Sequence, residues 1–83
     1  MIQNMNGDEL LKIDGFDDAI IGVEESVKSK LVYDIDKIAE ILMTREQMTK
    51  EDSYDYISYN ITSAYMGEKT PILIKVGKLK DFI

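Results

Sequence analysis

The sequence contains no cysteine, no histidine and no tryptophan. Without cysteine, disulfides and thiolate metal sites are excluded, so the fold depends on its apolar core alone or on self-association. Without histidine and cysteine, the common nucleophilic triads lack their usual base and a thiol nucleophile. Neither G-x-G-x-x-G nor G-x-x-x-x-G-K-[ST] occurs, so phosphate-binding loops of these types are missing too. The composition therefore predicts a protein that is not an enzyme, with no catalytic residue and no cofactor.

Long hydrophobic runs are also missing. No apolar run approaches the roughly 18 residues that span a bilayer. The segment Met1 to Leu11 is polar, and Asp8 and Glu9 stand where a signal peptide needs basic residues. We therefore expect a cytoplasmic protein with no membrane partner. The 83 residues, 45% of them apolar, predict one domain over 1–83, frayed at 1–8 and 78–83.

Basic residues are in the minority, and the charge is unevenly distributed. Sixteen acids and ten bases give a formal charge of −6. Residues 1–27 carry seven acids and one lysine, whereas residues 69–83 carry four lysines and one acid. The missing basic footprint argues against direct binding of nucleic acid, and the acidity suits a basic partner or simply keeps the protein soluble. The oppositely charged ends could attract each other or a second copy, so a homodimer is expected for this short chain.

Three short β-branched segments predict strands. Ala19 to Val23 is the first, although a helix over 17–28 fits the spacing of its apolar residues as well. Lys28 to Lys30 is typical of a turn, and Leu31 to Tyr33 then completes an antiparallel hairpin. Pro71 precedes the third strand, Ile72 to Val76, and proline is tolerated at a strand start.

Two helices are expected between the second and third strands. Asp34 or Asp36 can cap the first, whose apolar residues recur at helical spacing and which ends near Arg45. Thr49 can cap the second, and Gly67 stops the chain beyond it. The expected fold is therefore α+β, with a small antiparallel sheet of about three strands, two helices on one face and the order ββααβ.

Five carboxylates in the N-terminal third are the first candidate site: Asp14, Asp17, Asp18, Glu24 and Glu25. They form either an acidic contact patch for a partner or a solvated turn. An acidic mimic of nucleic acid, which would occlude a DNA- or RNA-binding protein, is an alternative if all five share one face. A further alternative is a small metal-dependent enzyme built on Asp14, Asp17 and Asp18. Their spacing is not that of an EF-hand loop, and we assign no metal ligand.

Tyr56 and Tyr59 are the second candidate site. They lie three residues apart and are offset from the helical stripe of Tyr54, Ile57 and Ile61. Exposed tyrosine favours interfaces because it combines a large contact area with a hydroxyl group. The two rings either contact a partner or cover the edge of the core.

From Phe16 onward the chain resembles a family of small uncharacterised bacteriophage proteins. The resemblance covers about sixty residues, from Phe16 to Ile74. Its pieces keep the family's order: Phe16-Asp17-Asp18-Ala19-Ile20-Ile21-Gly22, Tyr33-Asp34, Ile38 to Met43, Asn60, Gly67-Glu68 and Thr70-Pro71-Ile72. Tyr56 and Tyr59 stand where the family carries aromatic residues. The segment Val23 to Lys30 departs from the pattern in being more acidic and less rich in arginine.

This resemblance implies a phage or prophage origin. Small accessory phage proteins commonly bind host proteins or block host defences. The expected function is therefore that of a non-catalytic phage-type accessory protein, which binds and inhibits or modulates a host protein in the host cytoplasm, for example one of a defence system.

Overall fold

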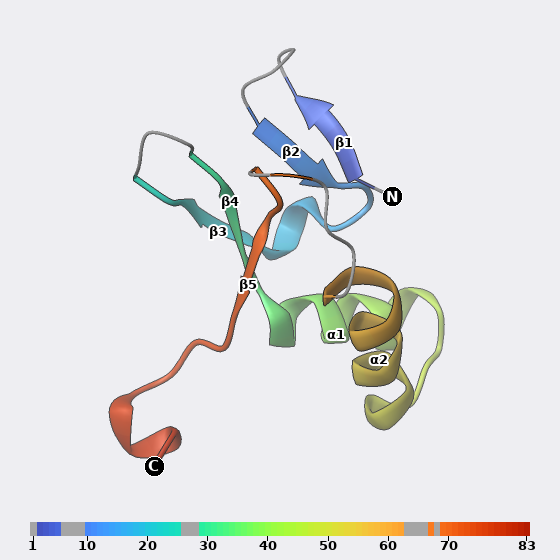
Figure 1. Cartoon of the computed structure of the whole chain (residues 1–83). Coiled ribbons are helices and arrows are strands. Elements are labelled where there is room, and N and C mark those ends of the chain that lie inside the picture. Colours follow the sequence, from blue (N-terminus) through green and yellow to red (C-terminus); the bar gives the residue numbers. More distant parts are fainter. Residues whose placement is uncertain (1, 6–9, 26–28, 63–66, 68) are drawn as a thin grey trace.

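The computed structural model describes residues 2–5, 10–25, 29–62, 67 and 69–83 (Figure 1). Its elements along the chain are β1 (Ile2–Met5), β2 (Leu10–Ile13), the 3₁₀ turn η1 (Asp17–Ala19), β3 (Ile20–Val23), β4 (Leu31–Asp34), α1 (Ile35–Arg45), α2 (Lys50–Ile57), the π-helical segment η2 (Ser58–Thr62), β5 (Ile72–Ile74) and the 3₁₀ turn η3 (Leu79–Asp81). The α+β class is confirmed, and the order from β3 to β5 is the expected ββααβ.

The central sheet has the strand order β3-β4-β5. β3 and β4 form the expected antiparallel hairpin. β5 instead runs parallel to β4, with Val32 aligned to Ile72 and Asp34 to Ile74, so the prediction of an antiparallel sheet is wrong for this pair and the sheet is mixed. A parallel neighbour requires a crossover of a dozen or more residues. The helices α1 and α2 between the two strands supply it.

The first half of segment 17–28 contains a short turn and a strand, not a helix. Asp17–Ala19 form η1 and Ile20–Val23 form β3. The register to β4 shifts between Ile20 and Gly22, which leaves Ile21 as the extra residue of a bulge. The predicted turn at 28–30 lies partly outside the described residues.

An N-terminal hairpin was not predicted. β1 and β2 pair antiparallel, from Ile2 opposite Ile13 to Met5 opposite Leu10, within a region expected to fray over 1–8. The residues that connect the two strands, 6–9, lie outside the described part of the chain. The backbone N–H of Ile13 attaches β2 to the sheet by donating to the Tyr33 hydroxyl at 2.8 Å.

Both helices begin at the predicted caps. The carboxylate of Asp34 accepts hydrogen bonds from the backbone N–H groups of Asp36 at 2.9 Å and Lys37 at 3.3 Å. The Thr49 hydroxyl accepts from the N–H of Asp52 at 3.1 Å. Each cap satisfies donors that have no partner within the helix. α1 ends at Arg45 as expected. α2 ends at Ile57, and the chain continues directly as the π-helical segment η2 to Thr62.

One side of the sheet carries the core. Leu31 and Tyr33, alternate residues of β4, are buried there, and Tyr33 is the largest fully buried side chain. The hairpin, η1, the loop before it and both helices contribute the remaining buried apolar residues: Ile13, Phe16, Ala19, Ile38, Ala39, Leu42, Ile57 and Ile61. The helices therefore pack on the face of Leu31 and Tyr33, and the opposite face of the sheet has no comparable cover among the described residues.

Arg45, at the end of α1, fastens the loop between β2 and η1. Its guanidinium donates to the carbonyl of Gly15 at 2.9 Å and lies 4.9 Å from the centre of the Phe16 ring. Gly15 has a φ of +90°, a conformation that favours glycine at this turn. Asp14 and Gly15 thus form a turn, and Phe16 is buried in the core.

The molecule is more open than a compact domain of its length. Its radius of gyration is 13.1 Å, compared with about 11.8 Å for 83 compact residues. Its accessible surface is 5699 Å², compared with about 5,050 Å² for a folded monomer of this mass. Part of this openness lies in the C-terminal segment, which projects away from the sheet and the helices (Figure 1).

Candidate protein-binding surface

The face of the sheet opposite the core is apolar and only partly covered, since Val32 and Ile72 are half-buried. Val32 on β4 alternates with the buried Leu31 and Tyr33, so it points to this side, and its parallel neighbour Ile72 points the same way. Ile74, two residues further along β5, is exposed. Gly22 on β3 pairs with Val32, and a Cβ added at Gly22 would meet no atom within 4 Å. We call Gly22, Val32, Ile72 and Ile74 the outer face.

Two further apolar side chains are exposed on β3. Ile21, the extra residue of the bulge, is 48% exposed, and Val23 at the end of the strand is 49% exposed. Large apolar residues on a strand are ordinarily half-covered by the neighbouring layer, and scattered single exceptions are common. Val23 is paired with Leu31 and therefore lies on the core side of the sheet, at its edge, whereas Ile21 lies in the bulge next to Gly22.

The chain leaves β5 as an exposed segment, 75–83, which we call the arm. Every residue of the arm is exposed, although Val76, Leu79, Phe82 and Ile83 are apolar. Within the arm, Leu79–Asp81 form the 3₁₀ turn η3. The N–H of Lys78 donates to the Asp81 carboxylate at 2.9 Å, and the N–H of Asp81 donates to the carbonyl of Lys78 at 2.8 Å. These reciprocal bonds hold η3 as a closed turn.

The predicted carboxylates fall into two groups at the two ends of β3. Asp14, Asp17 and Asp18 border a surface hollow of about 440 Å³. Lys12 and Arg45 border the same hollow, and Lys12 forms an ion pair with Asp17 at 3.2 Å. The negative charge of this group is therefore partly neutralised by neighbouring cations.

Glu24 and Glu25 border a second hollow, of about 340 Å³, together with Val23 and Ser29. The mimic of nucleic acid predicted all five carboxylates on one face, whereas the structure brings only the members of each group together. Within the described part of the chain, no three carboxylates converge as a metal site requires. The hypothesis of a metal-dependent enzyme at Asp14, Asp17 and Asp18 thus finds no support in their geometry.

The two predicted tyrosines have different environments. Tyr56 is partly buried and packs against the core, which is the second of the two interpretations made from the sequence. Tyr59 lies in the π-helical segment η2 and is 80% exposed. Only Tyr59 therefore presents its ring to a partner, on the helical side of the molecule and not on the outer face.

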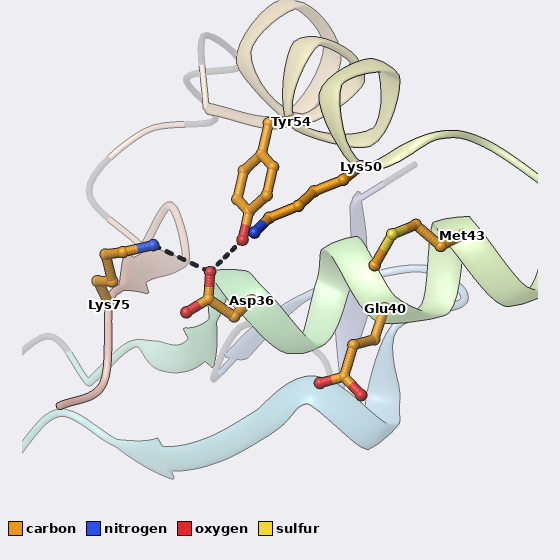
Figure 2. Close-up of a pocket in the computed structure, with 6 residues that line it drawn as sticks. All are labelled: Asp36, Glu40, Met43, Lys50, Tyr54 and Lys75. Carbon is orange, nitrogen blue, oxygen red and sulfur yellow. Dashed lines mark hydrogen bonds and ion pairs between the residues drawn. The ribbon is translucent and has the colours of Figure 1, made fainter.

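A polar cluster at the start of α1 was not predicted (Figure 2). The carboxylate of Asp36 accepts a hydrogen bond from the Tyr54 hydroxyl and pairs with the Lys75 ammonium at 3.1 Å. Lys75 also lies 5.6 Å from the centre of the Tyr54 ring. The cluster joins α1, α2 and the first residue of the arm beside a hollow of about 620 Å³. Its members are nearly forty residues apart in the sequence, so no local pattern indicates it.

This cluster ties α1, α2 and the arm together. Two hydrogen bonds lower the pKa of Asp36: the one from Tyr54 has the larger effect and the one from Lys75 the smaller. The hydrogen bond to Asp36 and partial burial raise the pKa of Tyr54 to about 12. Each shift moves the group away from neutral pH, where general acids and bases work best. Asp36 therefore stays ionised and Tyr54 stays protonated.

The outer face and the arm are the surfaces that the sequence analysis missed as a site. The sequence does contain a signal, because lysines alternate with apolar residues from Ile74 onward. That alternation is equally typical of a strand with one buried side, and only the structure leaves its apolar members uncovered.

Comparison of the chain with protein-family models, with curated proteins and with solved structures gives no significant match. The resemblance to small phage proteins therefore rests on the sequence pieces alone. Among the described residues, no helix combines the length and apolar composition needed to cross a bilayer.

Proposed function

We propose that this protein is a non-catalytic, phage-type binding protein that docks on a host protein through the outer face and inhibits or modulates it. The observation that carries the proposal is the apolar side of the mixed sheet opposite the core, where Ile74 is exposed, Val32 is only half-buried and Gly22 adjoins open space. A sheet face of this kind is ordinarily covered by another layer. A partner protein that supplies the layer gains the burial of this surface, at about 25 cal/mol for each Å².

The charge around this surface selects the partner. Glu24 and Glu25 directly follow β3, two and three residues beyond Gly22, and border a hollow beside Val23. This end of the strand attracts basic groups over distances up to a Debye length of about 10 Å and repels acidic surfaces. The preferred partner is therefore a protein surface that combines apolar and basic side chains. Inhibition follows if the same surface of the partner serves its own ligand.

Gly22→Lys tests this proposal without disturbing the core, because a side chain at Gly22 enters open space. The variant places bulk and a positive charge on the outer face. The matched control is Glu51→Gln, which changes the charge by the same amount at an exposed position of α2.

Wild-type protein and both variants are immobilised and exposed to lysate of the bacterial host. We expect a host protein that is recovered with the wild type and with Glu51→Gln but is lost with Gly22→Lys. The recovered protein is then purified, and its dissociation constant for each variant is measured by calorimetry. If no host protein distinguishes Gly22→Lys from the control, the proposal is wrong.

A further inference from the structure

The arm itself has the chemistry that the outer face selects. Its exposed apolar residues Val76, Leu79 and Phe82 are interspersed with Lys78 and Lys80, which are exposed as well. The arm carries three lysines and one aspartate, whereas Glu24 and Glu25 follow β3 directly, two and three residues beyond Gly22 of the outer face. The two surfaces thus match in apolar character and are opposite in charge.

The arm does not cover the outer face of its own chain. It leaves the sheet at the end of β5 and extends away from all three strands (Figure 1). Lys75 at its start is held on the core side of the sheet by Asp36, which fixes the direction in which the arm departs. Leu79 is 73% exposed and Ile83 is 92% exposed as a result.

From these observations we infer that two copies of the chain exchange their arms, each arm docking on the outer face of the other copy. The inference rests on the proposed function in one respect, since it uses the same face. The reciprocal exchange forms a closed pair with two identical contacts, so it does not continue into a fibre.

The surface available is of the size that such a pair needs. The chain exposes about 650 Å² more than a compact monomer of its mass, and a standard interface buries about 800 Å² per partner. The host protein of the proposed function then competes with the arm of the second copy. When the host protein occupies the outer face, it displaces the arm of the second copy. Binding of the host protein should therefore dissociate the pair.

The exchange is tested by sedimentation velocity over a range of protein concentrations. We expect the wild type to reach twice the mass of the chain. The double variant Leu79→Ser/Phe82→Ser removes two exposed apolar side chains of the arm, and Gly22→Lys blocks the face. The double variant is expected to weaken the pair about a hundredfold, the effect of losing two partly buried apolar contacts. Gly22→Lys is expected to weaken it at least as much, because a bulky charged side chain on the face prevents the arm from docking. Glu51→Gln should leave it unchanged.

Mixing the two defective variants distinguishes exchange from other modes of pairing. The arm variant keeps an intact face, and Gly22→Lys keeps an intact arm. A mixed pair therefore retains one of the two contacts and should form more strongly than either variant with itself. A pair held by face against face or by arm against arm gains nothing from mixing. We expect both variants to fold, because none of the three substituted positions belongs to the core. Far-UV circular dichroism checks this.

The outcomes separate this inference from the proposed function. A wild type that stays monomeric at every concentration overturns the arm exchange, and so does a pair that survives both variants or is not restored by mixing. If Gly22→Lys nevertheless loses a host protein from the lysate, the proposed function stands without the exchange. If the mixed pair forms as expected and no host protein depends on Gly22, the proposed function is wrong and the face serves self-association.

Discussion

The hydroxyl group of Tyr33 holds the N-terminal hairpin to the sheet, and its removal is the sharpest test of the core. Tyr33 is 0% exposed, Ile13 is 1% exposed, and the bond between the Ile13 N–H and the hydroxyl measures 2.8 Å. Tyr33→Phe keeps the ring and removes the acceptor. The Ile13 N–H is then buried without a partner, because the site is closed to water.

Leaving a buried donor unsatisfied costs about 1–3 kcal/mol. For a domain of this size, each kcal/mol corresponds to about 4–8 °C in the melting temperature. We therefore expect Tyr33→Phe to lower the free energy of unfolding by about 2 kcal/mol. The measurement is urea unfolding followed by far-UV circular dichroism, since the chain has no tryptophan to report by fluorescence.

Tyr59→Phe is the matched control, because it removes the same atom from a side chain that is 80% exposed. Surface changes of this kind stay within about 0.5 kcal/mol. If the free energy of unfolding of Tyr33→Phe also lies within that margin of the wild-type value, the hydroxyl does not anchor the hairpin and the reasoning is refuted. A reduced dependence on urea, with an early first transition, would instead show that the hairpin opens before the rest of the domain.

Three further predictions concern ionisation and capping. Burial raises the pKa of Tyr33, and the hydrogen bond to Asp36 raises that of Tyr54 to about 12. Tyrosine in the unfolded chain titrates near 10. The contribution of these two groups to the free energy of unfolding should therefore be fully present below about pH 10 and should fall as the pH rises towards 12. Urea unfolding at stepped alkaline pH measures this, and an unchanged slope in Tyr54→Phe would contradict it. The pKa of Asp36 is lowered by its bonds from Tyr54 and Lys75, so its contribution is present above about pH 4 and is lost as the pH falls further; Asp36→Asn should unfold with a shallower dependence on acid, and an identical acid profile would count against the tie. Asp34→Ala removes the cap of α1 and should cost about 1 kcal/mol in thermal unfolding, whereas Asp34→Asn should retain most of it; equal losses in both variants would assign the effect to charge instead.

Both helices and the β3–β4 hairpin could be predicted from local signals. Asp34 and Thr49 were recognisable as caps because capping depends on only three or four successive residues. The strand at Ile20–Val23 could not be separated from a helix by spacing alone, since a short apolar run fits both periods. Its pairing with β4 decides between them, and pairing is a property of two segments.

Non-local features could not be predicted from the same signals. The direction of β5 depends on how α1 and α2 return the chain to the sheet, and the strand residues read the same in either direction. The bond of Tyr33 to Ile13 and the tie of Asp36 to Lys75 join residues twenty and thirty-nine positions apart. The candidate site was missed for a related reason, because an exposed apolar face becomes recognisable only once the covering layers are placed.

The parallel pairing of β4 with β5 has a consequence for the order of folding. Val32 meets Ile72 across forty residues of chain, whereas β3, β4 and α1 are nearly contiguous. Contacts between distant residues require closure of a long loop before they stabilise anything, so they form late. The hairpin of β3 and β4 with α1 is the natural nucleus, and β5 joins it last. Substitutions in β5 should then accelerate unfolding while leaving the folding rate nearly unchanged.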